Sequence, residues 1–270
     1  MKTSKNKQTS GRSRKTKKRS SAGILISLIL VASVAGVILL FHHALQKDFS
    51  KAQAYLDSRS SQDVIAVEKA MAKRQRENLL QEMQQEDWSP FGFFNTSVIL
   101  GDSRAKGFAE FGFVPENRVL AGIGDQVHKA ADYTQAVSDL QPQTIFISYG
   151  INDIESNVGN AAGETGYGNL VGSLIEPIAD ANPDAQIAIN SIIDIADGAQ
   201  QGLLDHESIV EYNRQLQEIC NQMGWIYIDN SSLPAEDYYS ADGVHFDEAF
   251  YPIWAKNMVK TVVEASGDGQ

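Results

Sequence analysis

Four short polar blocks contain the residues of this sequence that are best suited to chemistry. The first block supplies a hydroxyl at Ser103, and the last supplies a carboxylate at Asp242 three residues before the imidazole of His245. A hydroxyl, an imidazole and a carboxylate together can perform nucleophilic acyl transfer. The blocks are GDS at 101–103, GIGD at 122–125, GIND at 150–153 and DGVH at 242–245.

Ester cleavage would give each of these groups a separate task. A serine hydroxyl is a poor nucleophile at neutral pH unless a base removes its proton. Histidine suits that role because its pKa lies near neutrality. A carboxylate then holds the imidazole in one tautomer. Ser103, His245 and Asp242 are therefore the candidates for nucleophile, base and orienting acid.

The developing oxyanion needs hydrogen-bond donors that are already in place. The backbone N–H groups of Ser103 and Gly124 and the side-chain amide of Asn152 are the candidates. Glycine at 124 lets the backbone approach a substrate closely. Gly122, in the same block, is the alternative.

Each block by itself is more typical of a turn or a helix cap than of a catalytic site. Their positions relative to the surrounding elements change this interpretation. Short, continuously apolar segments alternate with helix-like segments, which predicts a parallel sheet covered by helices on both faces. The predicted strands are 97–101, 118–121, 144–150, 186–192 and 225–229, and the predicted helices are 125–140, 165–181, 206–223 and 247–265.

The carboxyl ends of parallel strands face the same edge of a sheet, where active sites of such folds gather. Each polar block follows a predicted strand. We therefore expect the blocks to meet at this edge, with Ser103 at a helix start. The segment 194–206 is expected near the same edge, and the segment 157–169 is interpreted either as a substrate-facing lid or as a tolerated insertion.

The four blocks, in this order, resemble the signature blocks of the SGNH hydrolases, also called the GDSL esterase/lipase superfamily. The resemblance covers residues from about 95 to 265. It implies a three-layer α/β/α, flavodoxin-like domain with a five-stranded parallel sheet, assigned here to 88–270. It also implies Ser103 as nucleophile, His245 as base, Asp242 as its partner, and no metal or organic cofactor. Ser103, Gly124 and Asn152 would form the oxyanion hole; Gly124 is preferred to Gly122 because it precedes an acid.

One residue departs from the family pattern. Arg104 follows the serine where the name-giving motif has leucine. The G-x-S-x-G elbow of ordinary α/β-hydrolases is absent around Ser103, which argues against that fold.

The amino-terminal region has a different character. Residues 1–21 contain nine Lys or Arg and no acid, and residues 22–41 contain no charge. Twenty uncharged residues span about 30 Å as a helix, which is the thickness of a bilayer core. We expect a basic cytoplasmic tail, an uncleaved single-pass anchor at 22–41 and an extracytoplasmic body. A cleaved signal peptide and a nucleic-acid-binding arm are the alternatives.

Residues 44–87 contain neither Gly nor Pro and are rich in helix-forming residues, which predicts a helical stalk. Val64, Val67 and Met71 have helical spacing, so self-association through a coiled coil is an alternative role for the stalk. Beyond residue 21 the chain has 14 basic and 34 acidic residues, a net charge of -20, which argues against nucleic-acid binding. The lone Cys220 excludes an intrachain disulfide, and His128 and His206 are interpreted as structural or surface residues.

These observations predict a bacterial, membrane-anchored serine esterase at the cell envelope. Its substrate would be an acylated carbohydrate or another ester, from which it removes acetyl or another small acyl group. An O-acyltransferase that uses the same triad and a non-catalytic envelope scaffold are the two alternatives.

Overall fold

The computed structural model describes residues 73–85, 87–160 and 163–266, with single positions and short runs between 33 and 71. The predicted tail and most of the predicted anchor at 22–41 lie outside the described residues. Among the residues that are described, no helix is both long enough and apolar enough to cross a membrane. The chain divides into two compact units, Met1–Lys73 and Arg74–Gln270, and every described residue from 33 to 71 is helical.

The second unit contains a parallel sheet, and the described residues contribute five strands to it in the order β2-β1-β3-β4-β5. This is the strand order of flavodoxin-like folds. The predicted five-stranded parallel α/β fold is therefore confirmed. The strands are β1 Ser97–Gly101, β2 Val119–Ala121, β3 Thr144–Ser148, β4 Gln186–Asn190 and β5 Ile226–Ile228.

Alternate residues of each strand pack on opposite faces of the sheet. In β1, Val98 and Leu100 belong to one hydrophobic cluster, whereas Ile99 belongs to the other. Because both faces are covered by apolar side chains, the whole of β1 is buried. This is why the strands appear in the sequence as continuous apolar segments.

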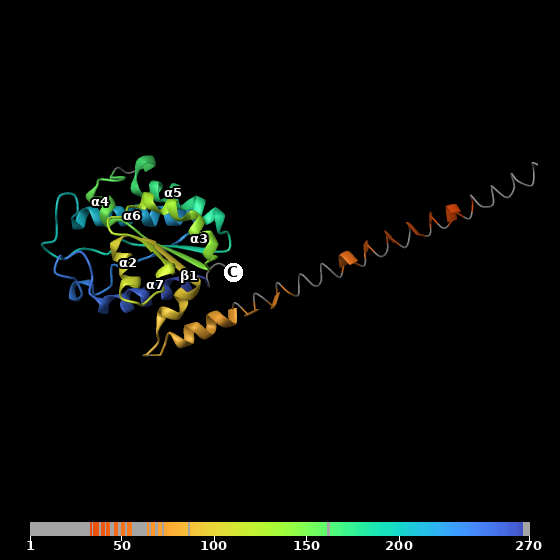
Figure 1. The fold of residues 1–270 in the computed structure, drawn as a ribbon, viewed down its shortest axis with the longest axis horizontal. Coiled ribbons are helices and arrows are strands. Elements are labelled where there is room, and N and C mark those ends of the chain that lie inside the picture. Colours follow the sequence, from red (N-terminus) through yellow and green to blue (C-terminus); the bar gives the residue numbers. More distant parts are fainter. Residues whose placement is uncertain are drawn as a thin grey trace, which may run out of the picture. The chain divides into compact units, whose positions relative to one another are not determined.

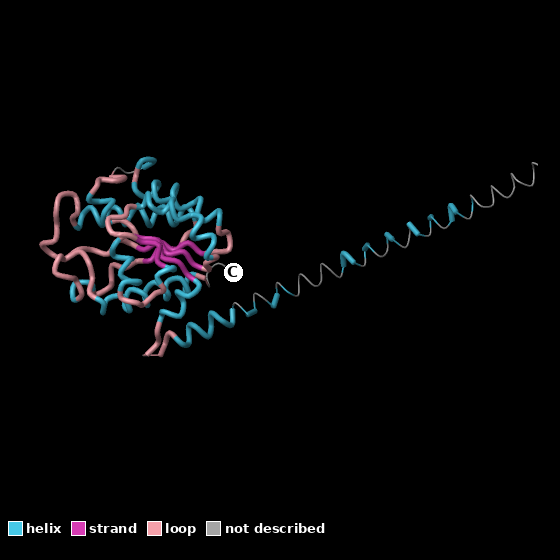
Figure 2. Tube along the Cα trace, viewed as in Figure 1, coloured by secondary structure: helices cyan, strands magenta, loops and turns pink. Residues whose placement is uncertain are grey.

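Two layers of helices enclose the sheet, as Figure 1 shows. One face carries α3, α5 and α6, and the other carries α2 and α7. Figure 2 shows the strands as a layer between these two sets of helices. The bounds are α2 Ser103–Glu110, α3 Thr134–Leu140, α4 Ile151–Glu155, α5 Tyr167–Ala181, α6 His206–Met223 and α7 Tyr251–Ala265.

The helix α6 has the predicted bounds, with Asp205 capping its start and Gly224 in the left-handed conformation at its end. Two other predicted helices begin as 3-10 turns. Residues Val127–Tyr133 precede α3, and Glu248–Phe250 precede α7. Helix α4 was not predicted, because its five residues are too few to show helical periodicity.

The last part of the predicted stalk belongs to the second unit. Residues 74–82 are helical, and Leu79, Leu80 and Met83 pack against the cluster beneath α2 and α7. Arg76 Nε also donates to the carbonyl of Val263 in α7, at 2.9 Å. This segment is therefore held by the body through apolar and polar contacts.

Candidate active site

The first candidate residue, Ser103, lies where β1 ends and α2 begins. Asp102 caps the helix, because its side chain accepts a hydrogen bond from the backbone N–H of Arg104 at 2.9 Å. Ser103 is therefore the first residue of the helix rather than its cap. The cap fixes the turn that holds the Ser103 hydroxyl at the carboxyl edge of the sheet.

The structure brings Ser103 together with His245 and Asp242, which are more than 130 residues further along the chain. Ser103 Oγ lies 2.7 Å from His245 Nε2. On the other side of the imidazole, His245 Nδ1 lies 2.7 Å from Asp242 Oδ2. A proton on Nδ1 that is donated to Asp242 leaves Nε2 free to accept the hydroxyl proton of Ser103. The three groups are thus arranged for general-base activation of a serine.

Asp242 has further partners that keep its carboxylate ionised. Its Oδ1 accepts hydrogen bonds from the backbone N–H groups of Val244 and His245, each at 2.9 Å. Partial burial raises the pKa of Asp242, but these two N–H groups and the His245 imidazole outweigh it and lower the pKa to about 2. The carboxylate therefore carries its charge throughout the pH range in which histidine titrates.

The site is open to solvent. The side chains of His245 and Asp242 are 43% and 52% exposed, respectively. Ile123, an apolar residue directly before Gly124, is 79% exposed. The imidazole and its carboxylate partner are therefore accessible from solvent.

The second and third blocks also meet at this edge. Asn152 Nδ2 donates to the backbone carbonyl of Asp125 at 2.9 Å, which places Asn152 beside the loop that contains Gly124. Gly124 has a φ of +75°, and a Cβ there would have open space around it. Gly122 differs, because a Cβ there would meet the carboxylate of Asp125 at 2.6 Å. Gly124 is thus the glycine of this block with free space around it.

Two carboxylates of the blocks are buried beneath the site. Burial raises the pKa of Asp102 to about 6, although the Arg104 guanidinium opposes this shift. Burial likewise raises the pKa of Asp153 to about 7. Asp153 accepts hydrogen bonds from the Val127 N–H at 3.1 Å and from the Tyr167 hydroxyl at 3.3 Å. It therefore connects the third block to the segment that follows the second.

The segment 194–206 contacts the loop that contains Asp242 and His245. Ala196 donates its backbone N–H to the carbonyl of Gly243 at 2.8 Å. His206, interpreted from the sequence as structural or surface, has carboxylate partners: its Nδ1 lies 2.7 Å from Asp194 and its Nε2 lies 3.4 Å from Asp197. The two ends of this segment are thereby held together. For the 157–169 segment, residues 161–162 lie outside the described chain.

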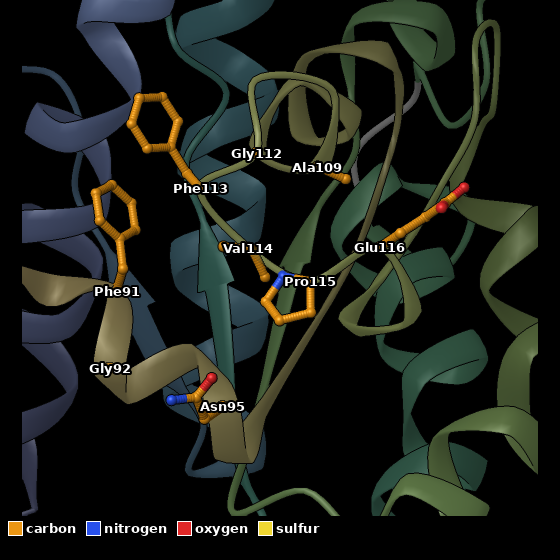
Figure 3. A pocket seen from close by; sticks show the side chains of 9 residues that line it. All are labelled: Phe91, Gly92, Asn95, Ala109, Gly112, Phe113, Val114, Pro115 and Glu116. Carbon is orange, nitrogen blue, oxygen red and sulfur yellow. The ribbon is translucent and has the colours of Figure 1, made fainter.

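A pocket of about 550 Å³ lies elsewhere on the body. It is lined by residues of the 3-10 turn before β1 and of the segment that leads to β2, so it lies at the amino ends of these strands. Phe91 and Phe113 stack at one side of it, with ring centroids 4.7 Å apart, and Glu116 lies at the other (Figure 3). This pocket is therefore separate from the edge that carries Ser103. The described part of the chain contains no cluster of three or more His, Cys, Asp or Glu residues suited to a metal ion.

Comparisons with known proteins identify relatives of this domain. The GDSL-like lipase/acylhydrolase family model matches residues 99–253. A solved lipase/acylhydrolase from Enterococcus faecalis is 17% identical; the match covers 62% of this chain and 95% of that one, with a TM-score of 0.48. A GDSL-like lipase from Bacteroides thetaiotaomicron is 19% identical; the match covers 64% and 89%, with a TM-score of 0.49. A search of curated proteins gave no match.

Proposed function

This chain belongs to the GDSL-like lipase/acylhydrolase family and is a serine ester hydrolase, and we propose that Ser103, His245 and Asp242 are its catalytic triad. The continuous hydrogen-bonded arrangement of these side chains supports the assignment, since both of its distances are 2.7 Å. The first joins the proposed nucleophile to its base at the expected range, and the second joins that base to the carboxylate that orients it.

In the proposed reaction, Ser103 Oγ attacks the acyl carbonyl carbon while its proton passes to His245 Nε2. The tetrahedral intermediate collapses by breaking the bond to the alcohol oxygen, and Nε2 gives the proton to the departing alcohol. Water then attacks the acyl-enzyme, again losing its proton to Nε2. The bond to Ser103 Oγ breaks, the proton returns to Oγ, and a carboxylic acid is released.

The Asp242 carboxylate would stabilise the imidazolium that forms in each half-reaction. The backbone N–H groups of Ser103 and Gly124, with the Asn152 amide, would donate to the oxyanion. The first turn of α2 supports this role, because the N–H groups at a helix start point toward developing negative charge. The hydrogen bond from Asn152 to the Asp125 carbonyl supports the participation of Asn152, since it brings the amide beside Gly124.

We also propose that the substrate is a small acyl ester, such as an acetyl group, on a carbohydrate or cell-envelope polymer. The exposure of His245 and Asp242 supports a bulky alcohol component, because a polymer needs an open surface. The predicted anchor at 22–41 supports an envelope location. With the basic residues of 1–21 in the cytoplasm, the body would lie outside the cell membrane.

Hydrolysis by the full-length chain in detergent tests the triad and the acyl preference together. Chromogenic acetyl, butyryl and octanoyl esters would be compared for the wild type, Ser103→Ala and the control Ser173→Ala, which removes an exposed hydroxyl from α5. We expect hydrolysis that depends on Ser103, is unaffected at Ser173 and is fastest with acetyl esters. Equal rates for the wild type and Ser103→Ala would refute the proposed triad. Faster hydrolysis of octanoyl than of acetyl esters would refute the proposed preference for a small acyl group.

The acceptor and the location are tested separately. Incubation with an acylated polysaccharide should release free acid; acyl groups recovered mainly on an added saccharide would instead indicate the transferase alternative. For location, protease added to intact bacterial cells should degrade the body. Protection of the body until the cells are lysed would refute the extracytoplasmic orientation.

A further inference from the structure

Arg104, the residue directly after Ser103, has an unusual environment for an arginine. Its side chain is buried, with the residue only 4% exposed. Three backbone carbonyls accept its hydrogen bonds: Nε donates to Val244 at 2.8 Å, Nη2 donates to Asp194 at 3.0 Å, and Nη1 donates to Ile193. A buried guanidinium is costly unless its donors are satisfied, so this arrangement requires all three partners to stay in place.

Two of the Arg104 contacts lie on either side of the proposed catalytic base. Val244 directly precedes His245, and its carbonyl receives the Nε hydrogen bond. Phe246 directly follows His245, and its ring centroid lies 4.9 Å from the guanidinium carbon. Arg104, which follows the proposed nucleophile, thus contacts both residues that flank the proposed base.

The backbone of Arg104 is fixed as well. Its N–H donates to Asp102 Oδ1 at 2.9 Å, and its carbonyl accepts from the Tyr251 hydroxyl at 3.0 Å. Arg104 is therefore anchored to the start of α2 and to α7, and it can transmit this rigidity to the loop around His245.

The functional part of that loop faces solvent, whereas Phe246 is buried and stacks on Phe250, with ring centroids 4.2 Å apart. Asp242 and His245 have half-exposed side chains. Within the loop, Ser240 N–H donates to the His245 carbonyl at 2.8 Å, but this bond does not connect the loop to the sheet. The Ala196–Gly243 bond connects it to another loop. Arg104 connects it directly to the helix that carries Ser103.

We propose that Arg104 is a positioning residue that holds the His245 imidazole at hydrogen-bonding distance from Ser103. The inference rests on the proposed function, since it requires His245 to be the base. Arginine suits the role because its planar, five-donor guanidinium satisfies several carbonyls at fixed angles, whereas lysine offers a single ammonium group. The alternative is that Arg104 serves only to neutralise the buried Asp102 and contributes to stability alone.

The test measures kcat and KM of the full-length chain with a chromogenic acetyl ester for Arg104→Met and Arg104→Lys. Lys106→Met is the control, because it removes a charge from the same helix at a partly exposed position. Misplacing a catalytic group by about 1 Å can cost about 100-fold in rate. We therefore expect a kcat loss of that order for Arg104→Met, a smaller loss for Arg104→Lys, little change in KM, and wild-type values for Lys106→Met.

A double-mutant cycle with His245→Ala separates positioning from stability. If Arg104 acts through His245, Arg104→Met should cause no further loss of kcat once His245 is absent. Multiplying losses would overturn the inference, as would wild-type kcat in Arg104→Met. Thermal unfolding would verify folding; if Arg104→Met does not fold, the same cycle with Arg104→Lys decides by the same criteria. Wild-type activity in Ser103→Ala or His245→Ala would instead refute the proposed triad, so the two failures are distinguishable.

Discussion

Asp242→Asn tests the proposed orientation of the catalytic base with a change of a single atom. In the structure, Asp242 Oδ2 lies 2.7 Å from His245 Nδ1, and Oδ1 accepts two backbone N–H groups. The amide oxygen of asparagine can replace Oδ1, which leaves its NH₂ group facing Nδ1. Two donors would then oppose each other, so the imidazole should adopt the tautomer with its proton on Nε2. That tautomer cannot accept the proton of Ser103.

The expected rate loss has two parts. Forcing the productive tautomer breaks the hydrogen bond from the asparagine NH₂ to Nδ1 and sets two donors against each other, which costs about 1–3 kcal/mol. Replacing the carboxylate also removes its attraction for the imidazolium, which is between about 1 and 4 kcal/mol at 4 Å, depending on the dielectric. Because both side chains are about half exposed, with values of 43% and 52%, we take about 2 kcal/mol for each part. The sum of about 4 kcal/mol corresponds to a kcat reduction of about 1000-fold.

Steady-state hydrolysis of a chromogenic acetyl ester would measure this loss at neutral pH. Asp237→Asn is the matched control, since it makes the same replacement at an exposed position five residues earlier. The thermal midpoint of Asp242→Asn should confirm that the variant folds. A folded Asp242→Asn enzyme whose kcat is within tenfold of the wild type would refute the proposed role of Asp242.

Three further predictions concern buried groups. Burial raises the pKa of the Cys220 thiol to about 12, so iodoacetamide at pH 8 should label Cys220 only after denaturation; rapid labelling of the native chain would contradict its burial. A Cβ on Gly107 would overlap the Tyr251 ring. Gly107→Ala should therefore destabilise the protein by about 1–3 kcal/mol and lower its thermal midpoint by several degrees. Gly92→Ala is the control, because a Cβ at Gly92 meets open space. Burial raises the pKa of Asp153 from 3.8 to about 7, so the folded protein binds this proton more tightly than the unfolded chain does. The contribution of Asp153 to the free energy of unfolding should therefore fall as pH rises from about 4 to 7. Thermal midpoints of Asp153→Asn should fall less over this range than those of the wild type or Asp237→Asn; parallel curves would show that Asp153 does not titrate there.

Much of the fold was predictable from local patterns in the sequence. Apolar segments such as 97–101 gave the strand position correctly, because a strand buried on both faces tolerates few polar residues. The helix 206–223 was equally clear from its apolar periodicity, and the structure adds Asp205 as the cap of its start. The strand ends were less accurate: β3 ends at Ser148 rather than at residue 150, because the backbone turns into α4 there.

The Arg104 contacts could not be predicted in the same way. They join Arg104 to carbonyls that are 89, 90 and 140 residues away, and the backbone of any residue can provide a carbonyl. No side-chain pattern in the sequence therefore marks the partners. The departure from leucine at 104 was visible, but its meaning depends on how two loops pack against α2. The partners of His206 are similar, since they depend on the path of the 194–206 segment.

The acids of the blocks divide into two groups with different physical roles. Asp242 is half exposed with a pKa lowered to about 2, so it is an ionised partner for an imidazole. Asp102 and Asp153 are buried and have raised pKa values. Burial therefore disfavours the ionised form of each carboxyl in the folded protein. Each nevertheless accepts a backbone N–H group: Asp102 accepts that of Arg104, within the turn at Ser103, and Asp153 accepts that of Val127, in the segment that follows the second block. A tight turn leaves its N–H groups without backbone partners, and a short carboxylate side chain can satisfy them. The acid at 102 is therefore explained by the geometry of its own turn, whereas the acid at 153 connects the third block to the segment that follows the second.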